Sequence, residues 1–258
     1  MSYLTDTVRR GTFANRPATA PDGTVYVCTD GPLQFIMKNG SWNSYLGSVP
    51  LNTPPAAPTW SLINCTLGST FSDSLGGLLF NGSCTAGTMQ VAKVSAPATP
   101  YSITTHMLIN WGVGGSSNAS SWNFCVGGIT WRDSSTGNLH VFAPCYATTV
   151  SGIYINTFRL LGASGTGTSG ITYTNSTDLN FAPLTSNLQN NGIWLRGTDD
   201  GTNRIASYSG DGVNFIQFAT LTRTTSINPT EVGIFAGNYA SAGQTTTPTT
   251  FFTSVKIG

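Results

Sequence analysis

The sequence is poor in charge, and above all in glutamate, of which it has one, Glu231. Charged residues make up 8% of the chain, against about 25% in an average soluble domain. Catalysis by proton transfer needs titratable side chains, so this shortage predicts a structural or binding protein and not an enzyme. The cations are scattered and the net charge is +1, so we expect no nucleic-acid partner and no membrane partner.

Long apolar runs and targeting signals are missing as well. No stretch approaches the roughly 18 apolar residues of a membrane-spanning helix. Residues 1–6 lack the basic-then-apolar layout of a signal peptide, so we expect synthesis in a cytosol.

Metal-binding patterns are also absent. The cysteines are odd in number, widely spaced and without a CxxC pair: Cys28, Cys65, Cys84, Cys125 and Cys145. This spacing argues against a zinc site, and we assign no metal-binding residues. We expect no cofactor, and we expect the cysteines to be reduced thiols that are mostly buried.

Glycine, serine, threonine and asparagine are abundant instead, with 30 glycines and 11% aromatic residues. Residues 1–50 predict a small β-meander with strands at 25–28, 33–37 and 41–45, the last two joined by an Asn-Gly hairpin turn. A unit of this size buries few side chains, so we expect it to lean on a partner. Three prolines within residues 51–59 predict an extended linker.

Residues 60–258 repeat a strand-and-turn pattern without a convincing helical stretch. The predicted strands are 101–111, 124–131, 139–143, 153–155, 158–160, 193–196, 204–209, 213–218, 232–235 and 251–257. Apolar and polar side chains alternate in the first of them, which indicates one face on a core. Two Asp-Gly turns near the C-terminus indicate hairpins. We therefore predict an all-β chain, whose second domain, 60–258, is an antiparallel β-sandwich of jelly-roll type.

The first unit carries an ordered set of short motifs. Gly11-Thr12-Phe13-Ala14-Asn15-Arg16-Pro17 precedes Gly23-Thr24-Val25-Tyr26, Asp30-Gly31 and Asn39-Gly40-Ser41-Trp42. Their order and spacing resemble a module found near the start of fibre and head-decoration proteins of tailed bacteriophages. The resemblance implies that residues 1–50 anchor the chain to a virion. It assigns the anchoring contact to Phe13, Arg16, Pro17, Tyr26, Phe35 and Trp42.

A second resemblance lies in the predicted hairpins of the second unit. Trp194-Leu195-Arg196, Asp199-Asp200-Gly201-Thr202 and Asp211-Gly212 are similar to the C-terminal meander of concanavalin A-like, laminin G-like jelly rolls. Those domains usually have Trp where this chain has Phe215. Arg132-Asp133-Ser134-Ser135-Thr136-Gly137 also matches one of their hairpins. The resemblance implies a lectin-like domain behind the anchoring module.

The carboxylates argue against a glycosidase of this fold. Such enzymes use a pair of carboxylates about 5–10 Å apart, and Glu231 has no glutamate partner. Asp199, Asp200 and Asp211 lie in predicted turns, where Asp serves backbone geometry. A Ca²⁺ site that uses Asp199 or Asp200 stays open as an alternative.

Histidine and tryptophan give two further expectations. His106 falls on the solvent or partner face of its predicted strand and His140 in the return strand of a hairpin, with no Ser-His-Asp arrangement. Trp111 and Trp131 fit core positions. Trp122 follows a polar loop, where it would stack on a sugar ring while Asn118 supplies hydrogen bonds. The alternative is that Trp122 packs on the edge of the sandwich.

The sequence thus favours a non-enzymatic phage virion protein that decorates or cements the capsid, or forms a head fibre. The alternative is a short tail fibre or receptor-binding protein that adheres to host glycans, but the heptads or collagen-like repeats of a long shaft are missing. A glycan hydrolase is the third candidate. We expect virion proteins and sister chains as partners, in a homo-oligomer such as a trimer. The expected location is the virion surface, after assembly in the bacterial cytoplasm.

Overall fold

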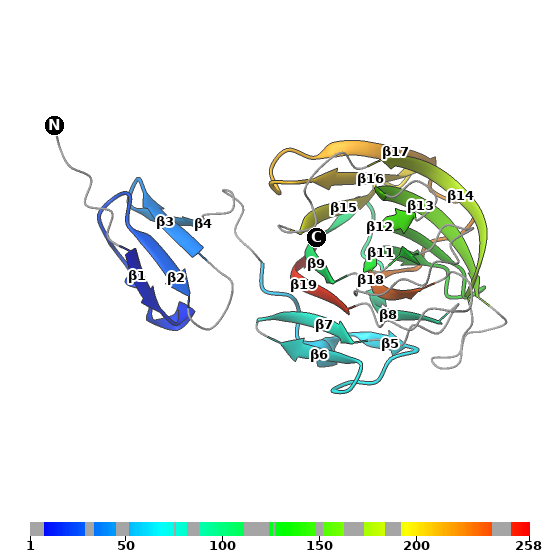
Figure 1. Cartoon of the computed structure of the whole chain (residues 1–258). Helices are drawn as coiled ribbons and strands as arrows, with labels where there is room; N and C mark the ends of the chain where they lie inside the picture. The colour runs from blue at the N-terminus through cyan, green and yellow to red at the C-terminus, as the bar shows by residue number, and fades with distance from the viewer. Residues whose placement is uncertain are drawn as a thin grey trace.

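The computed structural model describes the chain in segments, on which all the structural statements below rest. These are residues 8–28, 34–44, 52–74, 76–81, 88–110, 124–125, 127–147, 152–162, 173–183, 192–238 and 249–258. Within these segments no helix is long and apolar enough to cross a membrane. The strands form three sheets, one from the N-terminal segments and two from the rest of the chain (Figure 1).

The N-terminal sheet has the strand order β1-β2-β3-β4. Its strands are β1 (Val8–Gly11), β2 (Val25–Cys28), β3 (Gln34–Lys38) and β4 (Ser41–Ser44), with a 3-10 turn at Phe13–Asn15. The last three strands form the predicted meander, and Asn39 and Gly40 take positive φ in its hairpin turn, as Asn-Gly turns do. The expectation of only three strands was wrong, because β1 pairs in parallel with β2.

The remaining strands form two large sheets, as the sequence predicts. The eight-stranded sheet contains β5 (Ser61–Ile63), β8 (Thr88–Ser95), β10 (Phe124–Cys125), β11 (Gly127–Arg132), β12 (Leu139–Ala147), β13 (Gly152–Gly162), β14 (Tyr173–Pro183) and β18 (Glu231–Asn238). The seven-stranded sheet contains β6 (Phe71–Ser74), β7 (Gly77–Asn81), β9 (Tyr101–Asn110), β15 (Ile193–Asp199), β16 (Asn203–Ser209), β17 (Ile216–Thr222) and β19 (Thr249–Ile257). All pairings in both are antiparallel, which confirms the all-β sandwich.

The Asp-Gly turns lie where the sequence places them, but the strand after the second one starts later. β15 and β16 form the predicted hairpin around Asp200-Gly201. Strand β17 begins at Ile216, whereas the sequence predicts a strand from Val213. The reason is local: Asp211 Oδ1 accepts hydrogen bonds from the backbone amides of Val213 and Asn214, each at 2.8 Å, and this holds both residues in the turn.

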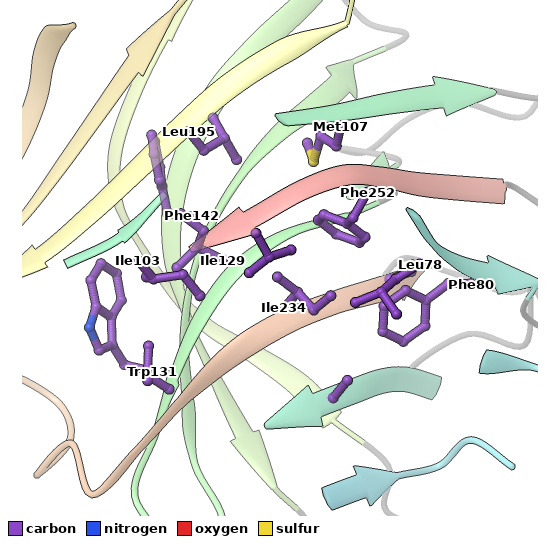
Figure 2. Packing of buried hydrophobic residues seen from close by; sticks show 14 of the residues in the cluster. Leu78, Phe80, Ile103, Met107, Ile129, Trp131, Phe142, Leu195, Ile234 and Phe252 are labelled. Carbon is purple, nitrogen blue, oxygen red and sulfur yellow. The ribbon is translucent and has the colours of Figure 1, made fainter. Parts of the chain in front are cut away.

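The main core lies between the two large sheets. Its side chains come from both inner faces, and Figure 2 shows fourteen of them, including Trp131, Phe142, Ile234 and Phe252. Trp131 is fully buried, which confirms its predicted place, while Trp111 lies outside the described residues. The ring of Trp131 fills the space above Gly197, where a Cβ atom would lie 2.7 Å from it. That position in β15 therefore needs a glycine.

A second apolar cluster lies on the opposite face of the eight-stranded sheet. Its residues are all fully buried: Ile63, Met89, Val91, Leu139, Val141, Ala143, Leu160 and Phe235. In β12 they alternate with His140 and Phe142, which face the main core. Because both faces of this strand are buried, residues 139–143 are almost uniformly apolar.

The segment predicted as a linker makes contacts with the sandwich. The Asn52 amide donates to Ser254 Oγ (3.1 Å), and the Ala57 amide donates to Asp73 Oδ1 (2.9 Å). Ala57 belongs to a 3-10 turn, Ala57–Thr59, and is buried in the main core together with Trp60. The division into domains at 1–50, 51–59 and 60–258 stays a prediction.

Candidate functional site

The aspartates of the two Asp-Gly turns stabilise these turns by accepting hydrogen bonds from backbone amides. Asp200 Oδ1 accepts the amides of Thr202 (2.7 Å) and Asn203 (2.5 Å), and these bonds lower the pKa of Asp200. Asp211 accepts amide and side-chain donors of its own turn, which lower its pKa as well. Asp199 is buried and forms an ion pair with Arg223 Nε (2.9 Å). All three carboxylates thus have hydrogen-bond or ion-pair partners within the fold.

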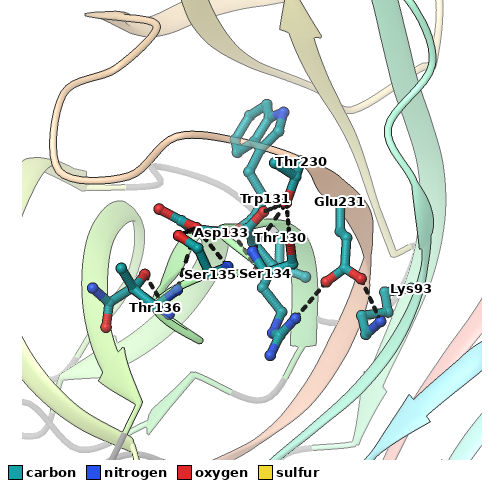
Figure 3. A network of polar contacts seen from close by, with 11 residues as sticks. Lys93, Thr130, Trp131, Asp133, Ser134, Ser135, Thr136, Thr230 and Glu231 are labelled. Carbon is teal, nitrogen blue, oxygen red and sulfur yellow. Dashed lines mark hydrogen bonds and ion pairs between the residues drawn. The ribbon is translucent and has the colours of Figure 1, made fainter. Parts of the chain in front are cut away.

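The only glutamate lies between two cations. Glu231 accepts from Arg132 Nη1 (2.5 Å) and from Lys93 Nζ (2.6 Å). Figure 3 shows this group beside the turn after β11, where Ser134 of that turn exchanges hydrogen bonds with Thr230, the residue before β18. The residues thus join β8, β11 and β18 at one end of the eight-stranded sheet.

Asp133 ties the same turn to the segment before β18. Its Oδ1 accepts the amide (2.9 Å) and hydroxyl (2.6 Å) of Ser135, and its Oδ2 accepts the amide of Asn228 (3.2 Å). Burial acts to raise the pKa of Asp133, but these hydrogen bonds together lower it. Asp133 is therefore a structural anion.

Every carboxylate side chain that the structure describes holds a backbone amide or a cation. Besides those above, Asp22 accepts the amides of Asn39 (2.9 Å) and Gly40 (3.2 Å), and Asp73 accepts that of Ala57. No group of three or more His, Cys, Asp or Glu in the described segments is arranged to hold a metal ion. Of the cysteines, Cys65 is described as a free thiol, and burial raises its pKa to about 11.

Both histidines are buried, which corrects the expectation for His106. Its side chain is 9% exposed: Nδ1 lies 2.5 Å from Thr253 Oγ1, and the ring packs against Trp194 in a tilted arrangement, with the ring centres 4.8 Å apart. His140 contacts Arg204 through Nδ1 (2.6 Å) and stacks on Trp131. Burial, and after it the charge of Arg204, hold the pKa of His140 well below its usual value. Burial likewise lowers the pKa of Arg204 to about 10.

In the N-terminal sheet, the residues assigned to anchoring lie together. The guanidinium of Arg16 lies 4.2 Å from the centre of the Phe35 ring and 6.0 Å from that of Trp42. Trp42 Nε1 donates to the carbonyl of Pro17 (2.6 Å), and its ring meets Tyr26 edge-on at 5.9 Å. We call Arg16, Phe35 and Trp42 the aromatic–arginine cluster.

The side chains of this group differ in exposure, because Tyr26 is buried whereas those of the aromatic–arginine cluster are not. Tyr26 is 3% exposed and donates to the carbonyl of Thr12 (3.0 Å). A Cβ atom at Gly11 would lie 2.3 Å from the Tyr26 hydroxyl oxygen, so this glycine leaves room for the bond. The three side chains of the aromatic–arginine cluster are half-buried. Together they form a partly exposed surface, and the buried Tyr26 supports it through its contact with Trp42.

A third feature lies on the outer face of the seven-stranded sheet, where the turn between β16 and β17 folds over it. Gly212 lies against the ring of Trp194, where a Cβ atom would be 2.6 Å away. Phe215 stacks on Arg196, whose guanidinium is 3.7 Å from the ring centre. Val213 and Ile216 project outward and are 50% and 58% exposed. The turn therefore covers one aromatic ring and presents apolar groups to solvent.

The comparisons with known proteins give a fold but no family. No protein-family model matches the chain, and no curated protein matches it. Among solved structures, the exoplasmic/lumenal domain of VIP36 in a Ca²⁺/Man3GlcNAc-bound form has a TM-score of 0.50 at 10% identity, over 81% of this chain and 86% of that one. The sandwich has a lectin-like fold.

Two further solved structures match with lower TM-scores. A legume lectin-like domain from Entamoeba histolytica has a TM-score of 0.48 at 10% identity, over 81% of this chain and 96% of that one. An alginate lyase in complex with dimannuronate has a TM-score of 0.41 at 13% identity, over 71% and 74%. At this level of identity, function has to be argued from the residues of this chain.

The structure brings together some of the residues that the sequence singles out. Arg16, Pro17, Tyr26, Phe35 and Trp42 form one group, and Phe13 lies in the adjoining 3-10 turn, with its side chain outside what the structure describes. The glycan candidates Asn118 and Trp122 fall outside the described residues. The sequence does not predict the exposed turn of the lectin-like sandwich, because its pattern indicates a strand over residues 213–218. Its signal was two large apolar residues beside an Asp-Gly turn.

Proposed function

We propose that this protein is a non-enzymatic structural protein on the surface of a tailed-bacteriophage particle. Its N-terminal sheet docks on neighbouring virion proteins, and its lectin-like sandwich faces outward as a decoration, a cement or part of a head fibre. Copies associate as a homo-oligomer, a trimer in the simplest arrangement. The observation that carries the proposal is the aromatic–arginine cluster, in which Arg16 and Trp42 of the virion-module motifs lie together with Phe35.

The physical character of this cluster supports a docking role. Trp and Arg are enriched among the side chains that dominate binding energy at protein interfaces. Arg16 is stacked on Phe35 and Trp42 is fixed by its bond to Pro17, so little conformational freedom remains to be lost on binding. A surface that is ordered in advance and half-buried suits a permanent contact in an assembly.

The hydrogen bonds and ion pairs of the carboxylates support a non-enzymatic role. In the described segments each carboxylate side chain is bound to amides or cations, and Glu231 is held between Arg132 and Lys93. A hydrolase of sugars needs one protonated and one ionised acid on either side of the scissile bond. The described residues offer no such pair.

Immunogold labelling of intact phage particles from the source culture tests the proposal. An antibody against the purified full-length chain is expected to label particle heads at a regular density. Mass spectrometry of gradient-purified particles provides the matched measurement, and the chain should co-purify in many copies per particle. Particles that carry neither label nor peptide would refute the proposal.

A second candidate is a short tail fibre that adheres to host glycans. It is favoured by the lectin-like fold, which this chain shares with a VIP36 domain solved in a Ca²⁺/Man3GlcNAc-bound form. The same labelling experiment separates the two candidates, because a tail fibre would place the gold at the tail tip.

A further inference from the structure

We propose that the turn between β16 and β17 of the lectin-like sandwich is a saccharide-binding site that takes a neutral pyranose ring on Phe215, with Val213 and Ile216 at its sides. The site does not depend on the virion proposal, because it uses no residue of the N-terminal sheet. It uses neither Asn118 nor Trp122.

The first argument is that Phe215 is a fixed platform. Its ring stacks on the guanidinium of Arg196 at 3.7 Å, and Arg196 is itself fixed by a bond from Nε to Thr104 Oγ1 (3.2 Å). Phe215 is partly exposed, and because the guanidinium covers one face of its ring, a ligand would have to stack on the other face. A ring that cannot rotate loses little entropy when a flat apolar ligand stacks on it.

The second argument is the mixture of groups around the ring. Val213 and Ile216 are two of the three large apolar side chains that are strongly exposed in the described residues, and the third, Leu67, lies elsewhere. Beside them the side chains of Asp211, Asn214 and Gln217 are exposed. A pyranose has an apolar C–H face and a rim of hydroxyls, so it can stack on the apolar groups while amides and a carboxylate bind its rim.

The turn holds these polar groups in place before any ligand arrives. Asp211 Oδ1 accepts the amides of Val213 and Asn214, and Asp211 Oδ2 accepts from Asn214 Nδ2 (2.7 Å). The Gln217 amide donates to Thr220 Oγ1 (2.9 Å). Asp211 Oδ2 accepts this one bond among the described residues, so it retains a lone pair for a sugar hydroxyl.

The size of the patch favours a sugar over a protein. A stable protein interface buries about 800 Å² on each partner. Such an interface takes about 20–30 residues from each partner, whereas this patch offers Val213, Ile216 and the partly exposed Phe215. The net charge beside the ring is small, because the charge of Asp211 is offset by that of Arg196, and this suits a neutral sugar.

An array of purified neutral polysaccharides from bacteria, plants and animals tests the proposal with the full-length protein. The wild type should bind at least one polysaccharide, and Phe215→Leu and Ile216→Ser should each weaken that binding about tenfold. Ile216 is exposed, so its replacement leaves the fold intact and keeps the test valid if Phe215→Leu unfolds the turn. The matched control Leu67→Ser, at an exposed site elsewhere, should change binding by less than about twofold.

Each other outcome overturns the proposal. If the wild type binds a polysaccharide and the turn variants bind it as well as Leu67→Ser does, the sugar site lies elsewhere on the protein. If the wild type binds no polysaccharide, or if the turn instead holds a second protein, the site is not a saccharide site. Neither result affects the virion proposal, which particle labelling decides on its own.

Discussion

Arg132 and Glu231 lie opposite each other on the paired strands β11 and β18, and their side chains form an ion pair at 2.5 Å. The Arg132 side chain is 4% exposed and that of Glu231 16% exposed, so the pair is largely removed from water. Lys93 contacts the second carboxylate oxygen from β8 on the other side of β18. Glu231 thus forms ion pairs with both cations at this end of the sheet.

Replacement of that acid should be costly. Glu231→Gln leaves the guanidinium of Arg132 buried without its counter-charge, and we expect a loss of about 2 kcal/mol in the free energy of unfolding. Urea denaturation followed by tryptophan fluorescence measures it. Asp200→Asn, at an exposed turn, provides the control and should cost less than the Glu231 change. A Glu231→Gln protein as stable as the wild type would show that the pair contributes nothing.

The contact between Gly197 and Trp131 predicts an overpacking effect. Gly197→Ala would place a Cβ atom 2.7 Å from the indole ring in the main core. We expect a loss of about 1–3 kcal/mol in unfolding free energy, because the buried ring must move. Gly210→Ala is the matched control, since its Cβ atom meets nothing within 4 Å. Equal stability of the two variants would mean that the core accommodates the added methyl group at no cost in free energy.

In the N-terminal sheet, Gly11 should matter for local order. Gly11→Ala places a Cβ atom 2.3 Å from the hydroxyl oxygen of Tyr26, and this breaks the bond to the Thr12 carbonyl. The support of the aromatic–arginine cluster then loosens, and amide hydrogen exchange in residues 8–44 should become about tenfold faster. Exchange in residues 192–238 serves as the internal reference and should not change. Unaltered exchange in the N-terminal sheet would contradict this role for Tyr26.

The buried His140 predicts a pH dependence of stability. Its folded pKa lies well below the ordinary value of about 6.5. The unfolded chain therefore takes up a proton near pH 6.5 that the folded protein does not. Stability should be full above that pH and fall by up to about 1.4 kcal/mol per pH unit as the solution becomes more acidic.

Urea denaturation between pH 7.5 and 5.5 measures this slope. His140→Gln should flatten it, while His106→Gln serves as the control for histidine replacement in general. An unchanged slope in His140→Gln would show that another group carries the pH dependence.

The sequence predicts those parts of the fold that depend on local signals. Asp200-Gly201 marks its hairpin because an Asp-Gly pair suits the positive φ of a tight turn. The parallel pairing of Val8–Gly11 with β2 leaves no such signal, because it joins segments without a tight turn between them. The sequence also predicts too early a start for β17. Val213 and Phe215 favour a strand, but the hydrogen bonds that Asp211 accepts from the backbone outweigh this preference.

The sequence does not predict which side chains are buried by contacts between distant segments. Alternation correctly places His106 on the outer face of its strand, but this does not show that Thr253 and Trp194 cover it. In the same way, the contact between His140 and Arg204 joins residues 64 positions apart across the two sheets. The contacts of Arg16 with Phe35 and Trp42, and the partial exposure of the three side chains, are visible only in the structure.

The central claim, docking through the N-terminal sheet, is tested most directly by adding purified full-length protein to particles that lack it. Co-sedimentation should recover the wild type with the particles, while a variant with both Arg16→Ala and Phe35→Ala stays in the supernatant. The sandwich variant Leu67→Ser should sediment like the wild type. Equal sedimentation of the double variant and the wild type would contradict the account.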